Sequence, residues 1–453
     1  MDCSSTCDVR VTAGGGQVAA HAGLWALGRF ADGLGLGVAL SAAVAQAGGR
    51  ARSHDRGRVL VHAVLMLAGG GEACADIEHL RAQPVLFGRV ASDSTLYRTL
   101  RGLGPDAVAA LWGAVAGVRA KVWERTGAAV SAEPVVLDID STLVEVHSEN
   151  KAGAAAHFKG GFGFHPMLCA TSEGETLSVR LRPGNAAANS IADHIEVLDA
   201  AIEQLPGQVA AGHRPGDALA ATRPLHLRVD AAGCSVSIAE ACRRRGIRFF
   251  MTARSNDEVT AAIDHNRLDT GAWQPALRAD GEPAERAQVA ELTDSVYLEG
   301  WPEGTRFIAR REPLHPGAQR TLFDSELWRY RGFYTDAAGD PASLDAHMRA
   351  HAQIEDTIAR LKDSGLARMP FSDFDANCAW TALTALGSAL VRWFQQLRLQ
   401  GSELANAAPK RLRWQLWHAP ARLVRSARTW TLRLLDWWPA TAQLLHACSP
   451  GAP

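Results

Sequence analysis

The segment Pro134-Val-Val-Leu-Asp138-Ile-Asp140-Ser-Thr142 decides the fold, because a helical pattern gives way here to an apolar run that ends in two acids. Such a run is typical of a buried strand in an α/β protein. Side chains alternate along a strand, so Asp138 and Asp140 share one face. Buried strands seldom end in two carboxylates without a cation, which indicates a catalytic site. The alternative is a polar strand end whose carboxylates cap a turn.

Further strands and helices are expected downstream of this segment. They follow in the order strand, strand, helix, strand, helix, strand, at residues 163–171, 176–182, 189–204, 225–230, 235–245 and 247–253. Three strands followed by alternating helices and strands is the order found in ribonuclease H-like folds. We therefore expect an α/β core of this kind, with its acids meeting at one edge of the sheet.

The patterns on either side of this core predict five parts of the chain. An all-helical N-terminal domain is followed by a core that a β-rich insertion divides, and a basic, aromatic helical tail ends the chain. The boundaries are 1–130 for the helical domain, 131–265 for the first part of the core, 266–345 for the insertion, 346–385 for the rest of the core and 386–453 for the tail.

Two segments indicate contact with nucleic acid. Residues 73–103 have the spacing of a helix-turn-helix, from which Arg98 and Arg101 would face phosphates or base edges. The alternative is an ordinary helical hairpin. The tail segment 392–433 carries nine basic residues and one acid, with tryptophans interleaved. It would suit nucleic acid, an anionic membrane or a protein partner.

Composition places the chain among globular proteins, with 47% hydrophobic and 21% charged residues. The formal net charge of -1 does not itself indicate a nucleic-acid partner. Eight cysteines show no disulfide or zinc spacing, and the polar segment 1–16 does not resemble a signal peptide. No apolar run is long enough to span a bilayer. We expect a cytoplasmic, nucleoid-associated protein with no membrane partner.

Two further acids join Asp140 as candidate site residues. Asp230 ends the strand expected at 225–230 and precedes a small-residue turn. Glu355 lies on a predicted helix whose apolar stripe faces inward, and Lys362 shares its face seven positions later.

The chain resembles bacterial insertion-sequence transposases of the DDE superfamily, in the branch with the motifs Leu-Asp-x-Asp-x-Thr and Lys-Gly-Gly-x-Gly-Phe-His-Pro, found here at 137–142 and 159–166. The family's Glu and Lys, with six residues between them, match Glu355 and Lys362. Its Tyr and Arg positions fall on Met348 and His351, where this chain departs from the pattern.

The resemblance implies a DNA transposase with two Mg²⁺ ions per active site, which Mn²⁺ is expected to replace. Asp140 would bridge both metals, while Asp230 and Glu355 would each hold one, and Asp138 would replace or assist Asp140. Water attacks first, and the freed 3′-hydroxyl then attacks target DNA. The partners implied are the terminal inverted repeats, target DNA and a second copy of the chain in a synaptic homodimer.

Further DNA contacts are expected outside the carboxylates. Lys362 would hold a phosphate, Lys159 lies in the glycine-rich motif, and Arg349 would substitute for the family's arginine. Trp273 and Trp328 would stack a base exposed at the cut end, or else pack within the insertion.

Two other functions fit parts of the sequence. Asp138, Asp140 and Thr142 resemble the Asp-x-Asp-x-Thr motif of haloacid dehalogenase-like phosphatases, in which Asp138 would be the nucleophile and Asp140 the acid-base residue. The lysine and later acidic pair of those enzymes cannot be placed in this sequence. A catalytically inactive DNA-binding protein is the other alternative, which the altered positions Met348 and His351 keep open.

Overall fold

The computed structural model describes residues 17–45, 54–217, 220–254, 256–266, 271–314 and 328–449. Segment 1–16, in which we expect no signal peptide, lies outside the described residues. So does part of the predicted insertion, at 267–270 and 315–327.

A nine-stranded sheet forms the centre of the molecule, in the order β10-β11-β12-β13-β9-β8-β2-β6-β7. Its core strands are β2 (Val135–Ser141), β6 (Met167–Thr171), β7 (Thr176–Arg180), β8 (Leu225–Val229) and β9 (Ile247–Thr252). Strands β2, β8 and β9 run parallel, and β6 and β7 are antiparallel to their neighbours. With α8 (Ile191–Glu203) before β8 and α10 (Val236–Arg244) before β9, the predicted order of strands and helices is confirmed.

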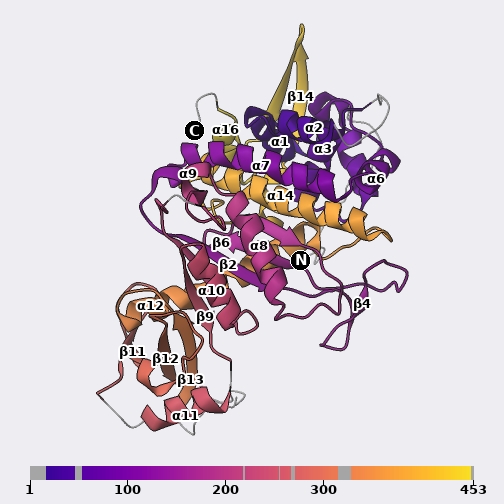
Figure 1. The fold of residues 1–453 in the computed structure, drawn as a ribbon. Coiled ribbons are helices and arrows are strands. Elements are labelled where there is room, and N and C mark those ends of the chain that lie inside the picture. Colours follow the sequence, from indigo (N-terminus) through magenta and orange to yellow (C-terminus); the bar gives the residue numbers. More distant parts are fainter. Residues whose placement is uncertain are drawn as a thin grey trace, which may run out of the picture.

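The two faces of the core sheet differ because side chains alternate along each strand. Leu137 and Ile139 pack with Leu227 on the face covered by α8 and α10. Leu168 and Ala170 pack on the opposite face against α13 (Gln353–Leu361). Asp138 and Asp140 alternate with Leu137 and Ile139 along β2, so they lie on the face toward α13. Figure 1 shows α8 and α10 over one side of the sheet.

The predicted insertion continues the core sheet. After α11 (Asp257–Asn266) it supplies four antiparallel strands, with a short helical turn, η3 (Thr293–Ser295), between the second and the third. These strands are β10 (Gln274–Leu277), β11 (Pro283–Glu291), β12 (Arg306–Pro313) and β13 (Trp328–Thr335). Strand β13 pairs with β9 through Phe333 to Thr335, so hydrogen bonds join the insertion to the core. The chain then enters α12 (Pro341–Arg349) and η4 (Ala350–Ala352), which lead directly to α13.

The helical N-terminal region and the C-terminal region share one hydrophobic core, which includes Leu27, Leu65, Trp380, Trp393 and Trp417. In Figure 1 the long helices α7 and α14 run beside one another across the sheet. The helices of this part are α1 (Ala22–Gly33), α2 (Leu36–Ala45), α3 (Arg56–Ala68), α7 (Pro105–Arg125), η2 (Ala128–Val130) and α14 (Phe374–Arg398). Residues that the sequence assigns to separate parts therefore fold together.

The predicted helix-turn-helix segment contains both of the expected helices. Its second helix is present as α6 (Asp93–Arg101), where the Ser92 side chain accepts from the Thr95 backbone N–H at 3.3 Å. The first helix, expected from Ala73 to Arg81, is present as the contiguous η1 (Cys74–Ile77) and α4 (Glu78–Arg81). The segment that joins the two helices contains one further helical turn, α5 (Pro84–Phe87), which Pro84 opens and Gly88, with φ of +67°, ends.

The prediction of a helical tail is wrong for residues 421–434. After α15 (Pro409–Leu412) and η6 (Arg413–Trp417), β14 (Ala421–Ser426) and β15 (Thr429–Leu434) form a hairpin, and α16 (Thr441–Cys448) follows. Buried Leu423 faces half-buried Leu432 across the ladder, and the β-branched Thr429 and Thr431 favour strand. Strand β1 (Val18–Ala19) pairs with β14.

A buried cluster of polar groups, here called the Glu175 hub, joins the helical region to the sheet. Arg119 of α7 donates to Glu175 at 2.5 Å, and both residues are almost fully buried. Trp123 and Trp393 donate their indole N–H groups to the same carboxylate at 3.0 and 2.7 Å. Gln204 accepts from Arg119. Every charge in the hub therefore has a partner.

Among the described helices, no single one is long and apolar enough to cross a bilayer. Helices α1 and α2, bent by 66° at their junction, reach the required length and composition together.

Candidate active site

Asp140 and Asp230 lie side by side at the ends of two parallel strands. The register pairs Ile139 of β2 with Val229 of β8, and the residue that follows each of these is an aspartate. Glu355 lies in the first turn of α13, which packs against β2. The sheet and this helix thus bring the three predicted acids to one edge.

Electrostatics at this edge reflect the proximity of the three carboxylates. Burial, together with the negative charges of Asp230 and Glu355, raises the pKa of Asp140 from 3.8 to about 6. The Ser141 backbone N–H and nearby His351 act in the opposite direction. The net effect is an excess of negative charge, which a bound cation would relieve.

Backbone groups hold one oxygen of each aspartate. The Ser141 N–H donates to Oδ1 of Asp140 at 2.6 Å. The N–H groups of Ala232 and Gly233 donate to Oδ1 of Asp230 at 3.0 and 3.3 Å. In the part of the chain that the structure describes, no hydrogen bond occupies Oδ2 of either residue, so these oxygens are available to a ligand.

Asp138, two residues before Asp140, has a different environment. Its side chain is 1% exposed and accepts two hydrogen bonds from Arg228, at 2.7 and 2.6 Å. Nδ1 of His351 lies 2.7 Å from Oδ1 of the same carboxylate. The charge of Asp138 is matched within the protein, whereas that of Asp140 is not.

Arg228 also connects this cluster to the helix before the glutamate. Its third contact is to the backbone carbonyl of His347 in α12, at 2.7 Å. Burial, together with Arg228 and His226, lowers the pKa of His347 to about 4. A neutral imidazole therefore packs beside the guanidinium at neutral pH. Sequence reasoning missed Arg228, although a charged residue inside the apolar strand Leu225–Val229 marks it as a partner for a buried acid.

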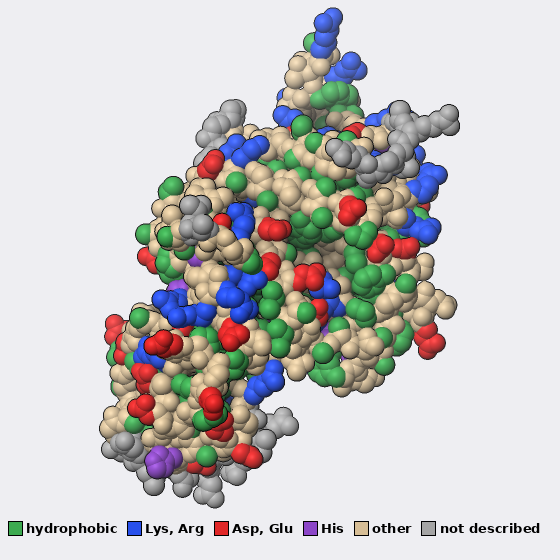
Figure 2. Space-filling view, in the orientation of Figure 1, with side chains coloured by type: hydrophobic (Ala, Val, Ile, Leu, Met, Phe, Trp, Pro, Cys, Tyr) green, Lys and Arg blue, Asp and Glu red, His purple; other side chains and the backbone are tan. Residues whose placement is uncertain are grey.

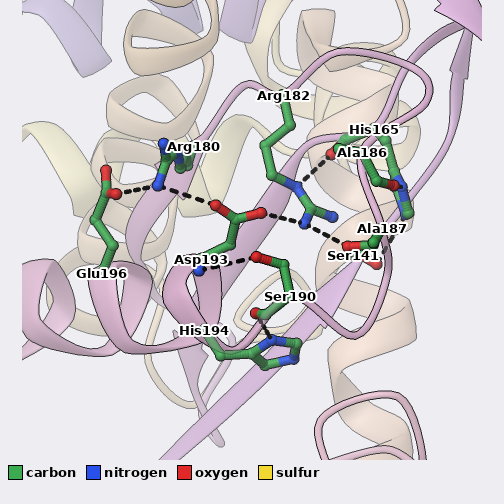
Figure 3. A network of polar contacts seen from close by, with 10 residues as sticks. All are labelled: Ser141, His165, Arg180, Arg182, Ala186, Ala187, Ser190, Asp193, His194 and Glu196. Carbon is green, nitrogen blue, oxygen red and sulfur yellow. Dashed lines mark hydrogen bonds and ion pairs between the residues drawn. The ribbon is translucent and has the colours of Figure 1, made fainter.

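A second network fixes the residues that follow Asp140 (Figure 3). His165 Nε2 lies 2.9 Å from Ser141 Oγ, and its Nδ1 lies 2.9 Å from the Ala186 carbonyl. Arg182, 2% exposed, donates to the His165 carbonyl and to Asp193 of α8. Both ring nitrogens of His165 are therefore engaged by neighbouring residues.

His194 of α8 is a site neighbour that the sequence did not indicate. Its Nδ1 lies 2.7 Å from the Ser190 carbonyl (Figure 3). Burial lowers its pKa, and nearby Asp230 acts in the opposite direction. A Cβ on Gly233 would come within 3.0 Å of His194 Nε2, so glycine allows the Asp230 turn to pack against this ring.

Lys362 and Lys159, both predicted to contact DNA, are brought together. Lys362 is half-buried at the start of η5 (Lys362–Leu366), and burial lowers its pKa. Lys159 lowers that pKa further and Glu145 raises it. Lys159 lies between β4 (Ala155–Ala156) and β5 (Phe162–Phe164), which form a small sheet with β3 (Val144–Glu145).

The remaining predicted DNA contacts lie elsewhere. Arg349 donates to Asp345 at 3.0 Å and to the Leu277 carbonyl of the insertion at 2.5 Å. Arg98 and Arg101 are exposed on α6 of the helical region.

The tryptophans predicted to stack a base are packed within the insertion. Trp273 is 6% exposed and donates its indole N–H to the Asn266 carbonyl. The guanidinium of Arg311 lies 4.3 Å from its ring centroid and 5.0 Å from that of half-buried Trp328. This arrangement agrees with the alternative of packing within the insertion.

The donor set at the edge is suited to a hard cation. Asp140, Asp230 and Glu355 offer carboxylate oxygens, which Mg²⁺ prefers. No group of three or more His, Cys, Asp or Glu side chains among the described residues is already arranged to hold a metal ion. Coordination would therefore draw the three carboxylates closer together.

Comparison with known proteins places this site in context. The family model described as Transposase DDE domain group 1 matches residues 2–450, nearly the whole chain. No curated protein matches the sequence.

Proposed function

This chain belongs to the family Transposase DDE domain group 1, whose activity is DNA cleavage and joining in transposition, and we propose that it acts at the ends of a bacterial insertion sequence. It cuts the DNA there and joins the freed 3′-hydroxyl ends to target DNA. The observation that supports this assignment is the convergence of Asp140, Asp230 and Glu355 at one edge of a ribonuclease H-like sheet.

Asp140, Asp230 and Glu355 would hold the two Mg²⁺ ions of this proposal. The ions, when bound, neutralise charge on the attacking and leaving oxygens of the phosphodiester. The protein contributes the uncompensated negative charge that attracts them, since the pKa of Asp140 is raised to about 6 by burial and by its acidic neighbours. Backbone N–H groups hold the opposite oxygen of each aspartate and so fix its orientation.

Asp138 has a positioning role in this proposal. Arg228 and His351 together occupy its carboxylate, and both contacts reach toward the segment that carries Glu355. Breaking them to bind a metal would leave Arg228 buried without its acid, which is strongly unfavourable. In this proposal Asp140 therefore binds metal, whereas Asp138 holds the helix of Glu355 against the sheet.

Lys362 and Lys159 are proposed to hold a phosphate beside the cut. The two ammonium groups lie close enough for Lys159 to lower the pKa of Lys362, so together they form a local positive centre. His351 stands at the position of the family's arginine, and it contacts Asp138 of β2 instead of a phosphate.

A phosphatase is disfavoured by the geometry of Asp138. That residue would have to be a free nucleophile, yet three hydrogen-bonding contacts from Arg228 and His351 enclose its carboxylate. An inactive DNA-binding protein is disfavoured because all three acids are present at one edge of the sheet.

Magnesium-dependent cleavage of a labelled duplex carrying the element's own terminal repeat tests the proposal. The parent protein is expected to cleave, whereas Asp230→Asn and Glu355→Gln bind the duplex without cutting it. Asp356→Asn is the matched control, since Asp356 is the exposed neighbour of Glu355 and pairs with Arg360. Tight binding without cleavage by the parent would favour the inactive DNA-binding protein.

The homodimer is proposed for the synaptic complex, because two transposon ends must be held together. Light scattering with end DNA should show two protein copies per complex, and a complex with one copy would refute this.

A further inference from the structure

A two-stranded ribbon, formed by β14 and β15, projects from the helical part of the molecule. Six residue pairs from Ala421↔Leu434 to Ser426↔Thr429 join its strands, giving a length of about 20 Å at roughly 3.4 Å per residue. In Figure 1 it extends beyond the helices, at the end opposite β11 and β12. Figure 2 shows basic side chains on this projection. The ribbon therefore reaches away from the carboxylate edge.

The base and the outer part of the ribbon have different surfaces. At the base, Leu423 faces Leu432, and both contact the core shared by α1 and α14. Toward the tip, Arg425 faces Trp430, whose ring lies 5.7 Å from the guanidinium and which is 43% exposed. The base thus anchors the ribbon, and its outer half serves no packing role within the chain.

Charge on the ribbon is unbalanced. Segment 421–434 contains four arginines and no acid. Arg422 lies directly opposite Arg433, an arrangement of like charges that destabilises a hairpin. No ion pair or hydrogen bond within the described chain engages the guanidinium groups of Arg422, Arg425, Arg428 and Arg433. An anion from outside the described chain would relieve this repulsion.

Other basic residues in the same C-terminal region have partners within the chain. Arg411 pairs with Glu403 at 2.5 Å, and Lys410 pairs with Asp363 at 3.3 Å. Arg413 donates to the backbone carbonyl of Asp363. The ribbon is thus the portion of this basic region whose charge is left for a partner.

We propose that this ribbon lies in a groove of the DNA duplex, away from the cut, and anchors the transposon end through its phosphates. A two-stranded ribbon fits the major groove, which is about 12 Å wide. Arginines from both strands then face the phosphates on either side, and Trp430 packs against the sugar and base edges. The inference rests on the proposed function and adds a DNA contact remote from the carboxylates.

The test compares Arg425→Gln/Arg428→Gln with the parent protein. Both residues are exposed, so their replacement leaves the fold intact. Affinity for a labelled duplex of arbitrary sequence should fall about tenfold or more near 0.1 M salt, and the slope of log affinity against log salt should fall by about 1.8. Cleavage at saturating end DNA should stay unchanged. Arg29→Gln/Arg244→Gln removes the same charge at exposed helical positions and should change neither quantity.

A second variant removes the ribbon tip by replacing 425–430 with Asn-Gly, and the same loss of affinity is expected. Unchanged DNA affinity in both ribbon variants would overturn the inference while a cleaving parent leaves the proposed function standing. A parent that neither binds nor cuts DNA would instead refute the proposed function. Loss of dimer formation, or of binding to phosphatidylserine vesicles, with DNA affinity unchanged would assign the ribbon to another partner.

Discussion

The Glu175 hub and the carboxylate edge both bury charge, but they do so in opposite ways. In the hub, Arg119 and two indole N–H groups surround Glu175, so the buried carboxylate is fully compensated. At the edge, half-buried Asp140 lies beside two further acids, and its pKa is raised to about 6. Compensated charge holds elements together, whereas uncompensated charge marks a place for a ligand.

The largest effect is expected from breaking the hub. Glu175→Ala leaves Arg119 buried without its acid, which should lower the free energy of unfolding by about 3–5 kcal/mol. Urea denaturation measures this. Glu173→Ala removes an exposed acid two residues away and should change stability by no more than about 0.5 kcal/mol. Equal effects of the two substitutions would mean that the hub does not stabilise the fold.

The two acids of β2 should respond in opposite directions. Asp138→Asn weakens the partner of buried Arg228 and should lower the free energy of unfolding by about 2–4 kcal/mol. Asp140→Asn removes repulsion with Asp230 and Glu355 and should raise the stability of the metal-free protein by about 1 kcal/mol at neutral pH. Thermal unfolding in a chelator measures both. A shift of the same sign in the two variants would contradict the division of roles.

The pH dependence follows from the raised pKa of Asp140. Its ordinary value is 3.8 and its folded value is about 6, so the folded state binds more protons between these limits. Stability of the metal-free protein should therefore fall as pH rises from about 4 to 6, with Asp230, Glu355 and His351 facing the group. Asp140→Asn should remove this fall, which unfolding across the pH range detects.

Added Mg²⁺ should oppose the fall in stability that the metal-free protein shows as pH rises. At a tenfold excess over its dissociation constant, the ion should stabilise the parent by about 1.4 kcal/mol above pH 6. The effect should fade as Asp140 becomes protonated. A stabilisation that persists unchanged in Asp140→Asn would place the metal elsewhere.

The smallest effect on stability is expected at Lys362. Lys362→Gln removes a half-buried ammonium that pairs weakly, so stability should change by no more than about 0.5 kcal/mol. The salt slope of end-DNA binding should fall by about 1 if Lys362 holds a phosphate. Lys410→Gln, which removes a lysine paired with Asp363, is the control and should leave the slope unchanged. Equal slopes in all three proteins would show that Lys362 contacts no phosphate.

The core of the fold was predictable because its signals are local. The apolar run before Asp140, the strand before Asp230 and the stripe of α13 each reveal their element within a few residues. The strand order brings Asp140 and Asp230 together, and the packing of α13 against β2 adds Glu355. The raised pKa of Asp140 then agrees with the proximity that this order implies.

Other features depend on pairing between distant residues, which a single sequence does not reveal. Arg228 and Asp138 are cross-strand neighbours, but they are separated by 90 positions and meet only through the register of β2 and β8. The pairing of Phe333 with Thr252 likewise makes the insertion part of the sheet. In the tail, arginines and tryptophans obscured the two-residue alternation of β14 and β15, so a helix was expected.

The continuous hydrogen bonding from β10 to β7 has a mechanical consequence. A sheet resists shear between its strands, so β10–β13 and the strands that carry Asp140 and Asp230 must move together as one rigid sheet. After β13 the chain continues through α12 and η4 to α13, which carries Glu355 and packs against β2 of the same sheet. A force applied to β10–β13 would therefore also move the strands that carry Asp140 and Asp230.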